Sequence, residues 1–434
     1  MKPVLFAIAL AVAVLVSSPA EAVPRFAARN GNECIQCHIS PTGGGIRNAY
    51  GRNVFERAWL PRAAAPRRED YVVKPRPAGG AGDGAGGQAG ADSDDDSDDD
   101  DVVFDPEINP WMVLGGDLRA AYIMIRPDKG TAPGEDPEIT NSFFLMQADL
   151  YHAMTLNKHV TTVLDIGAYS GFEAWALFHA KPEPSEYDLM LKVGRFLPAF
   201  GIREVEHQLF TREGIGLGAA DRDTGLELTG FAGPFTATVS LLNGTLGDTA
   251  FDTHGTERRR FEKAAASRLS IRGDAGWVRG QLGASFYWNQ NNNQANPLFG
   301  RSIPSADAAE VGAGVEELRA GAFLTANLGR FTYLADLAWV RDEFSSDRLS
   351  TLRGYTSYQE LSFLPTQGLD VIGTFEFADP DLDLLDNSTA RAGLVVEFFP
   401  WPFTELRAMV RRTWSDASPT GGAWDVVVFS HLFM

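Results

Sequence analysis

The sequence predicts an all-β protein, a transmembrane antiparallel β-barrel of about 16 strands, preceded by a small N-terminal helical domain. Three observations lead to this prediction. Most of the chain repeats stretches of about ten residues in which apolar and polar side chains alternate. Aromatic residues make up 11% of the 434 residues, and many lie near the ends of these stretches. After the first 22 residues no apolar run is long enough for a spanning helix, so strands remain the elements that cross a membrane.

The first 22 residues have the pattern of a secretory signal peptide. Lys2 provides a basic start, residues 4–16 are an apolar run, and Ala20-x-Ala22 supplies the small residues of a cleavage site. A membrane anchor is the alternative, but about 13 apolar residues are fewer than the ~20 that a spanning helix needs. We therefore expect cleavage after Ala22 and export of the mature chain.

Charge divides the mature chain into three parts. Residues 23–77 carry ten Lys or Arg and four Asp or Glu, residues 78–110 carry eleven acids and no base, and residues 111–434 carry 27 bases and 41 acids. Residues 92–101 include eight aspartates after a Gly- and Ala-rich run, a composition that cannot build a core. We predict a disordered acidic linker at 78–110 rather than a Ca²⁺ loop, because the fixed Gly and closing Glu of an EF-hand are missing. The formal charge of −19 argues against nucleic acid as a partner.

One short motif in residues 23–77 carries redox chemistry. Cys34-x-x-Cys37-His38 is the attachment signal of a c-type haem. Two thiols at this spacing can form thioethers to the two vinyl groups of one haem, and the adjacent imidazole then ligates the iron on its proximal side. We therefore predict one covalent haem c, attached at Cys34 and Cys37 with His38 as the proximal iron ligand, in a monohaem cytochrome c domain at 23–77.

A thiol redox pair and half of a zinc site are the alternatives for these two cysteines, which are the only ones in the chain. A redox pair is expected in a βαβ context, which the surrounding sequence lacks. A zinc site needs further ligands close by, whereas the next histidine is His152. Haem attachment is the interpretation we prefer.

The sixth ligand of the iron is left open, because residues 39–111 contain neither His nor Met. Either the iron is five-coordinate, or the ligand is an unusual group, or the C-terminal domain supplies it. The candidates are Tyr50, Lys74, the mature amino terminus, Met112, Met124, His152, His159 and His207. Arg47 and Arg52 are candidate partners for the haem propionates, although solvated arginines are the simpler interpretation.

Residues 111–434 fit a barrel that faces lipid. One face of each alternating stretch is apolar, and the other carries charged residues, Gly and hydroxyl groups. A soluble β-sandwich would bury its apolar face and break its strands more often with Pro. Only closure pairs every backbone edge group within lipid. The expected strands begin near Trp111, Asn141, His159, Phe172, Tyr187, Asp223, Pro234, Ala264, Gly276, Gly314, Arg330, Gly354, Gln367, Ser388, Trp401 and Trp424.

A signal peptide, then the Cys34-x-x-Cys37-His38 motif, then an outer-membrane barrel resembles the fused cytochrome–porins, whose best-known group serves iron-oxidising bacteria. In that family a single haem at the barrel's mouth or in its lumen is thought to pass electrons from extracellular Fe²⁺ to periplasmic carriers. The resemblance implies a location in the bacterial outer membrane, with the haem domain in the lumen or on the periplasmic side. The implied partners are periplasmic electron-carrier cytochromes, an extracellular electron donor or acceptor, and outer-membrane lipid. The long aspartate linker departs from the family's compact pattern.

A second, narrower resemblance lies in residues 193–244. The segments 193–201, 222–227 and 242–244 resemble those of phosphate-selective porins. Four arginines of this region are candidates for an anion-selective constriction, namely Arg195, Arg203, Arg212 and Arg222. Nearby acids nearly cancel their charge, which favours an ordinary charged lumen.

Three functions follow from these patterns. The first is electron transfer by a haem that a porin barrel carries in the outer membrane. The second is an anion or nutrient porin with a tethered haem domain of redox or sensory role. The third is a haem enzyme such as a peroxidase, for which the sequence offers no acid–base partner fixed beside the motif. An electron carrier, with oxidation of Fe²⁺ as one example, is favoured over an enzyme that converts a substrate.

Overall fold

The computed structural model describes most of the barrel and part of the N-terminal region. The described residues are 24–62, 107–109, 111–130, 134–167, 171–182, 185, 187–203, 209–218, 221–244, 263–291, 315–344, 351–416, 418 and 420–433. The predicted signal peptide at 1–22 and residues 78–106 of the predicted linker lie outside them. The last residues of that linker, Glu107–Asn109, form the short strand β1, which pairs with β2.

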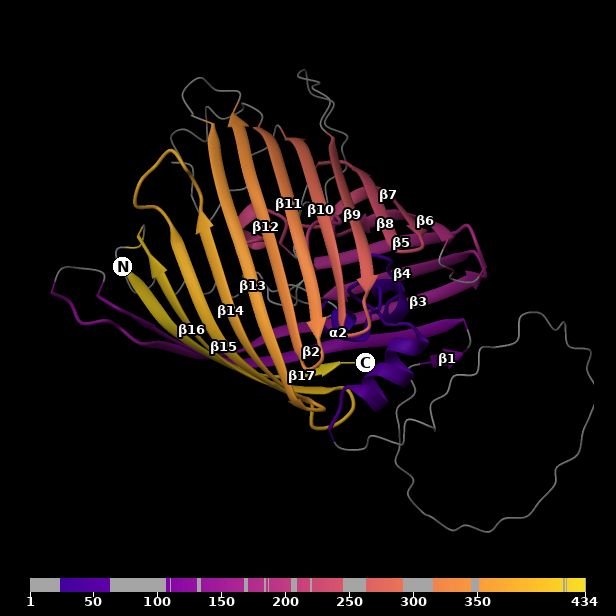
Figure 1. Cartoon of the computed structure of the whole chain (residues 1–434), viewed down its shortest axis with the longest axis horizontal. Helices are drawn as coiled ribbons and strands as arrows, with labels where there is room; N and C mark the ends of the chain where they lie inside the picture. Colours follow the sequence, from indigo (N-terminus) through magenta and orange to yellow (C-terminus); the bar gives the residue numbers. More distant parts are fainter. Residues whose placement is uncertain are drawn as a thin grey trace, which may run out of the picture.

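The C-terminal region is a closed antiparallel barrel. Sixteen of the described strands, β2 to β17, each pair with their sequence neighbour, and β17 pairs with β2 to close the ring (Figure 1). These strands are β2 (Met112–Pro127), β3 (Thr140–Asn157), β4 (Val160–Gly167), β5 (Gly171–His179), β6 (Tyr187–Phe196), β7 (Asp223–Ala232), β8 (Phe235–Leu242), β9 (Ala264–Asp274), β10 (Val278–Asn291), β11 (Val315–Leu328), β12 (Phe331–Phe344), β13 (Leu352–Thr366), β14 (Leu369–Asp379), β15 (Thr389–Phe398), β16 (Thr404–Ser415) and β17 (Gly422–Phe433). The prediction of about 16 strands is confirmed, and each strand begins within three residues of its expected position.

The barrel is apolar outside and polar inside. In β8 the exposed residues are Phe235, Ala237, Val239 and Leu241, whereas the hydroxyls of Thr236, Thr238 and Ser240 are buried. Leu241 has 63% of its surface exposed, which in water would be costly for one residue after another along a strand. Strands of this pattern are stable when the outer face contacts lipid and all backbone groups are paired around a closed ring.

The two ends of the barrel differ. At one end, tight turns join β7 to β8, β11 to β12, and β13 to β14; at the other, the connections are longer. In barrels of the outer membrane the short turns face the periplasm. The N-terminal helices, indigo in Figure 1, lie at the short-turn end, near the label of α2. The Arg62 amide donates a hydrogen bond of 2.9 Å to the carbonyl of Phe399, in the turn between β15 and β16. This contact holds residues 24–62, which we call the N-terminal segment, at this end of the barrel.

Residues 24–62 are packed inside this end of the barrel. They form α2 (Pro24–Asn30), the single turn α3 (Cys34–Cys37) and the π-helix η1 (Gly51–Trp59). Their apolar side chains pack on the barrel: Phe26 and Leu60 against Phe399 and Phe433, and Ala28 against Phe323 of β11. The predicted small N-terminal helical domain is therefore not confirmed. The described residues 24–62 form short helices, and Phe26, Ala28 and Leu60 lie in apolar clusters shared with the barrel.

A second segment enters the lumen from the other end. The described residues between β6 and β7 are 197–203, 209–218 and 221–222, which include the short 3-10 helix η3 (Glu213–Ile215) and are largely buried. We call these described residues the inward loop. Phe200, Ile215 and Leu217 belong to the main apolar cluster of the lumen, together with Ile46 of the N-terminal segment. The described helices include none that is both long and apolar enough to cross a membrane.

Candidate functional site

The predicted haem motif is a tight turn held from one side by Asn48. The His38 amide donates to the Cys34 carbonyl at 2.8 Å, so both cysteines and the histidine lie on one helical turn. The Asn48 side-chain amide donates to the carbonyls of Ile35 and Gln36 at 2.9 and 3.0 Å. Its side-chain oxygen accepts from the Gly51 amide at 3.0 Å. Asn48 therefore fixes the motif turn against the start of η1.

Gly51 makes this packing possible. A Cβ atom at position 51 would overlap the carbonyl oxygen of Cys37. Only a residue without a side chain allows η1 to approach the motif turn so closely. Glycine at position 51 is therefore required by this backbone contact.

The motif faces a cavity of about 480 Å³ between the N-terminal segment and the barrel wall. Cys34, Cys37 and His38 line it together. Much of the remaining lining is apolar, from both the segment and the barrel: Phe26, Phe55, Phe231, Phe399 and Phe433. A volume in this range is typical of sites for cofactors and other small molecules.

The residues at this cavity fit a c-type haem. The two cysteines are not joined to each other by a disulfide, and both line the cavity beside His38. The buried His38 Nδ1 has no hydrogen-bond partner among the described residues. Arg47 lines the same cavity, with Phe433 beneath its guanidinium at 5.0 Å from the ring centre. Thiols for attachment, an imidazole for the iron, apolar walls for the ring and a cation for a carboxylate are therefore gathered at one place.

Burial controls the protonation of the motif. The pKa of His38 is lowered to about 3, mainly because burial disfavours its charged form and also because Arg47 and Arg203 are close. The imidazole is therefore neutral at physiological pH, which is the form that ligates iron. Burial raises the pKa of Cys37 to about 11, and the neighbouring Cys34 adds to the shift. Cys37 is therefore a protonated thiol in the unmodified chain.

The predicted sixth ligands do not gather at the cavity. Tyr50, Met112, Met124, His152 and His159 are all described, and none of them lines it. Lys74, the mature amino terminus and His207 lie outside the described residues.

His431, which the sequence analysis did not select, is the only imidazole besides His38 among the described residues that line the cavity. It lies on β17, and both ring nitrogens are engaged: Nδ1 with Glu405 at 2.9 Å and Nε2 with Asp117 at 2.8 Å. Ligating a metal would require one of these contacts to break.

The two arginines considered for propionates have different surroundings. Arg47 forms an ion pair with Glu56 and lines the cavity. Arg52 is buried, donates to the Arg47 carbonyl at 2.8 Å, and does not line the cavity. Arg47 thus keeps the proposed position, whereas Arg52 supports the backbone that carries it. Within the described part of the chain, no cluster of three or more His, Cys, Asp or Glu side chains is arranged to hold a metal ion.

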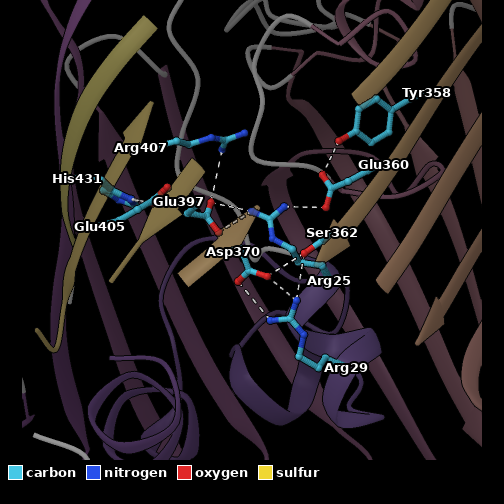
Figure 2. A network of polar contacts seen from close by, with 10 residues as sticks. All are labelled: Arg25, Arg29, Tyr358, Glu360, Ser362, Asp370, Glu397, Glu405, Arg407 and His431. Carbon is cyan, nitrogen blue, oxygen red and sulfur yellow. Dashed lines mark hydrogen bonds and ion pairs between the residues drawn. The ribbon is translucent and has the colours of Figure 1, made fainter. Parts of the chain in front are cut away.

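Two arginines of α2 attach the N-terminal segment to the barrel wall (Figure 2). Arg25 donates to Glu360 at 2.8 Å and, through its other terminal nitrogen, to both oxygens of Glu397 at 2.7 and 2.8 Å. One turn along, Arg29 donates to Asp370 at 2.6 Å and to Ser362 at 3.2 Å. The partners belong to three adjacent strands, β13, β14 and β15.

Sequence reasoning missed this attachment because its partners are more than 300 residues away along the chain. The available signal was the spacing of Arg25 and Arg29, which places both side chains on one face of a helix. Glu33 adds a contact on another side, since it forms an ion pair with Arg272 of β9 at 2.8 Å. The segment is therefore held by charges of both signs.

The four arginines of the possible constriction do not form a simple ring. Arg212 donates to the Phe200 carbonyl at 2.5 Å, and Arg222 pairs with Glu173 at 3.0 Å. Arg203 contacts Gly43 of the N-terminal segment at 2.7 Å, and Arg195 donates to the Phe172 carbonyl at 3.3 Å. These contacts fit the interpretation of an ordinary charged lumen, with the difference that Arg203 and Arg212 line the cavity at the motif.

No protein-family model and no curated protein sequence matches the chain. Solved structures do match. The chain is similar to the anion-selective porin from Comamonas acidovorans, with a TM-score of 0.51 and 12% identity over 74% of this chain and 99% of the porin. It is equally similar to Pseudomonas putida OprB, with a TM-score of 0.51 and 12% identity over 74% of this chain and 94% of that protein. At this identity the likeness concerns the fold. Together with the apolar outer face, it confirms the predicted bacterial outer-membrane barrel.

Proposed function

We propose that this protein transfers electrons at the outer membrane by means of one haem c that is held inside the periplasmic end of a porin barrel. The observation that carries the proposal is the 480 Å³ cavity that Cys34, Cys37 and His38 line together inside the lumen. A motif that matched the haem signal by chance would have no reason to face a cavity of cofactor size.

The haem, when bound, supplies one-electron chemistry. The chain's own residues have three tasks. Cys34 and Cys37 attach the group, His38 presents a neutral imidazole to the iron, and the phenylalanines of α2, η1 and the wall exclude water. Arg25 and Arg29 keep this assembly in the lumen by contacts with the wall. We infer that the segment also obstructs the pore, because it and the inward loop both occupy the lumen.

The position of the motif suggests the partners. The short-turn end would face periplasmic electron-carrier cytochromes, which could then approach the haem closely. An extracellular donor or acceptor, for example Fe²⁺, would act from the end with the longer loops. The direction of electron flow is to be measured, by reduction or oxidation of the haem from the outside.

A porin with a tethered haem domain is the second candidate function. The observation that favours it is the fold, which is similar to that of an anion-selective porin, together with arginines along the lumen. The two functions differ in what moves through the barrel. Electron transfer needs a lumen that remains obstructed to solutes, whereas a porin needs an open path for solutes.

The test uses the full chain, matured in a host that attaches haem c and reconstituted in lipid vesicles. We expect a haem that survives acid-acetone extraction, rapid reduction or oxidation by an external Fe²⁺/Fe³⁺ couple, and a low single-channel conductance. The matched control replaces both Cys34 and Cys37 by Ser, which leaves the barrel intact and removes the attachment. Absence of covalent haem in the unaltered protein would reject the proposal. A redox-inert haem with high conductance would support the porin, and turnover of peroxide would support an enzyme.

A further inference from the structure

We propose that Arg203, in the inward loop of the barrel, is a positioning residue of the haem site, because it holds the backbone loop that directly follows His38. The inference deepens the proposed function and rests on it. It adds that the haem site is built from two parts of the chain: the motif in the N-terminal segment and a cation contributed by the barrel.

The contact between Arg203 and the loop is close and specific. One terminal nitrogen of its guanidinium donates to the Gly43 carbonyl at 2.7 Å, and the other lies 3.5 Å from Glu173 on β5. Gly44 has a φ of +76°, and a Cβ there would overlap the guanidinium of Arg203. Glycine is therefore required at position 44 both by the left-handed backbone and by the arginine that packs on it.

A second cation from the wall holds the same loop. Lys192 on β6 donates to the Thr42 hydroxyl at 3.1 Å and pairs with Glu227 on β7 at 2.6 Å. Thr42 in turn lies 3.1 Å from the Ser40 hydroxyl. Residues 40–44 thus contact two barrel cations, each of which also lies close to a carboxylate on a barrel strand.

The loop transmits this positioning to His38. Its two sides are joined at the base, where the Ile39 amide donates to the Ile46 carbonyl at 3.2 Å and His38 bridges to Arg47. A displacement of residues 42–44, at the tip of the loop, should therefore move the base of the loop, where His38 lies. Arg203 also lines the cavity that Cys34, Cys37 and His38 line.

A fixed positive charge close to a redox centre favours the reduced form of that centre. Removing the charge of Arg203 should therefore lower the midpoint potential of the haem and alter the geometry of the proximal ligand. A purely structural role in the barrel would change neither quantity once the protein is folded. The two effects of Arg203 can be separated. Arg203→Lys keeps the positive charge, whereas Gly44→Ala disturbs the position of the guanidinium.

The experiment is spectroelectrochemistry and resonance Raman spectroscopy of the full-length protein in detergent. For Arg203→Gln we expect the equilibrium constant for haem reduction to fall about tenfold, which is ~59 mV for one electron. Arg203→Lys should recover most of this loss. Gly44→Ala, which displaces the guanidinium without removing its charge, should shift the iron–histidine vibration. Arg341→Gln, which changes a partly exposed arginine paired with Glu343, is the matched control and should leave both readouts unchanged.

The outcomes separate the inference from the function on which it rests. A haem whose potential and iron–histidine vibration are the same in the unaltered protein, Arg203→Gln and Gly44→Ala would overturn the positioning role and leave electron transfer intact. A folded, unaltered protein without covalent haem would overturn both. If Arg203→Gln does not fold, Arg203→Lys and Gly44→Ala decide, because an unchanged vibration in Gly44→Ala contradicts the inference by itself.

Discussion

The barrel wall and the N-terminal segment are stabilised in different ways. In the wall, each strand pairs along its length with both neighbours, and its side chains alternate between lipid and lumen, as in β8. The N-terminal segment has three short helices, and its buried residues Phe26, Ala28 and Leu60 belong to apolar clusters that include barrel residues. Its position is fixed by individual contacts such as those of Arg25. The comparison indicates that the wall can form without the segment, whereas the segment depends on the wall.

Deletion of residues 24–62 gives the sharpest test of this asymmetry. We expect the truncated chain to form a barrel of unchanged β-content, because none of the pairs between β2 and β17 involves the deleted residues. Its single-channel conductance should rise several-fold as the lumen is vacated, as measured in planar bilayers. A truncated chain that fails to form a barrel would show that the wall needs the segment, and the comparison would be wrong.

Substitution of Arg25 should have the next largest effect. Arg25→Ala leaves the buried carboxylates of Glu360 and Glu397 without this partner, and breaking a buried ion pair costs about 3–5 kcal/mol. We expect that loss in the free energy of docking of the N-terminal segment, measured as lost hydrogen-exchange protection of α2. Protection in the barrel strands should persist. Glu343→Gln, which removes the exposed partner of Arg341 on β12, is the control and should leave the protection of α2 unchanged.

A charge on the outer face tests the wall instead of the segment. Leu394 lies within β15 with 56% of its surface exposed, so it should contact lipid. Leu394→Arg should destabilise the barrel by about 2–4 kcal/mol, the cost of an arginine near the middle of the bilayer. Denaturant unfolding in lipid vesicles measures this loss, and Leu394→Ala should have a much smaller effect. Equal effects of the two variants would indicate that this face does not contact lipid.

Glu56 gives a pH dependence confined to the segment. Burial raises the pKa of this carboxyl from 4.5 to about 8, despite its ion pair with Arg47. Between these pH values the docked segment retains a proton that the undocked chain has lost, so docking should weaken as pH rises. The slope is at most about 1.4 kcal/mol per pH unit. The hydrogen-exchange protection of η1 should fall between pH 5 and pH 9 in the unaltered protein. In Glu56→Gln it should change less over the same pH range. Identical profiles would contradict the assignment.

The same contrast explains how much could be predicted from the sequence. Strand positions follow from a period of two residues, which is a local pattern, and β8 or β12 can be recognised without knowing their neighbours. The turn at Cys34-x-x-Cys37-His38 is equally local. No local pattern indicates the place of that turn in the lumen, which was one of the two positions implied by the family resemblance, because it depends on a contact between Arg25 and Glu360 across 335 residues of chain. The cavity contribution of His431 was hidden for the same reason, since it comes from the last strand.

The inward loop marks a further limit of the sequence. Residues 193–201 and 222–227 resemble segments of phosphate-selective porins, and the segment between them carries Arg203 and Arg212 among acids that nearly balance them. Nothing in this composition indicates that the loop folds into the lumen. The contacts that hold it there are to other strands, for example the Ile202 amide to Asp336 of β12 at 3.0 Å.

The closure of the ring between β17 and β2 has a consequence for biogenesis. Once the first and last strands are zipped together, the helices of residues 24–62 can reach their seat only through the periplasmic opening. A segment that carried the proposed haem would have to pass that opening or be enclosed while the seam is still parted. On the proposed function, attachment of the haem would therefore precede docking of the segment in the lumen.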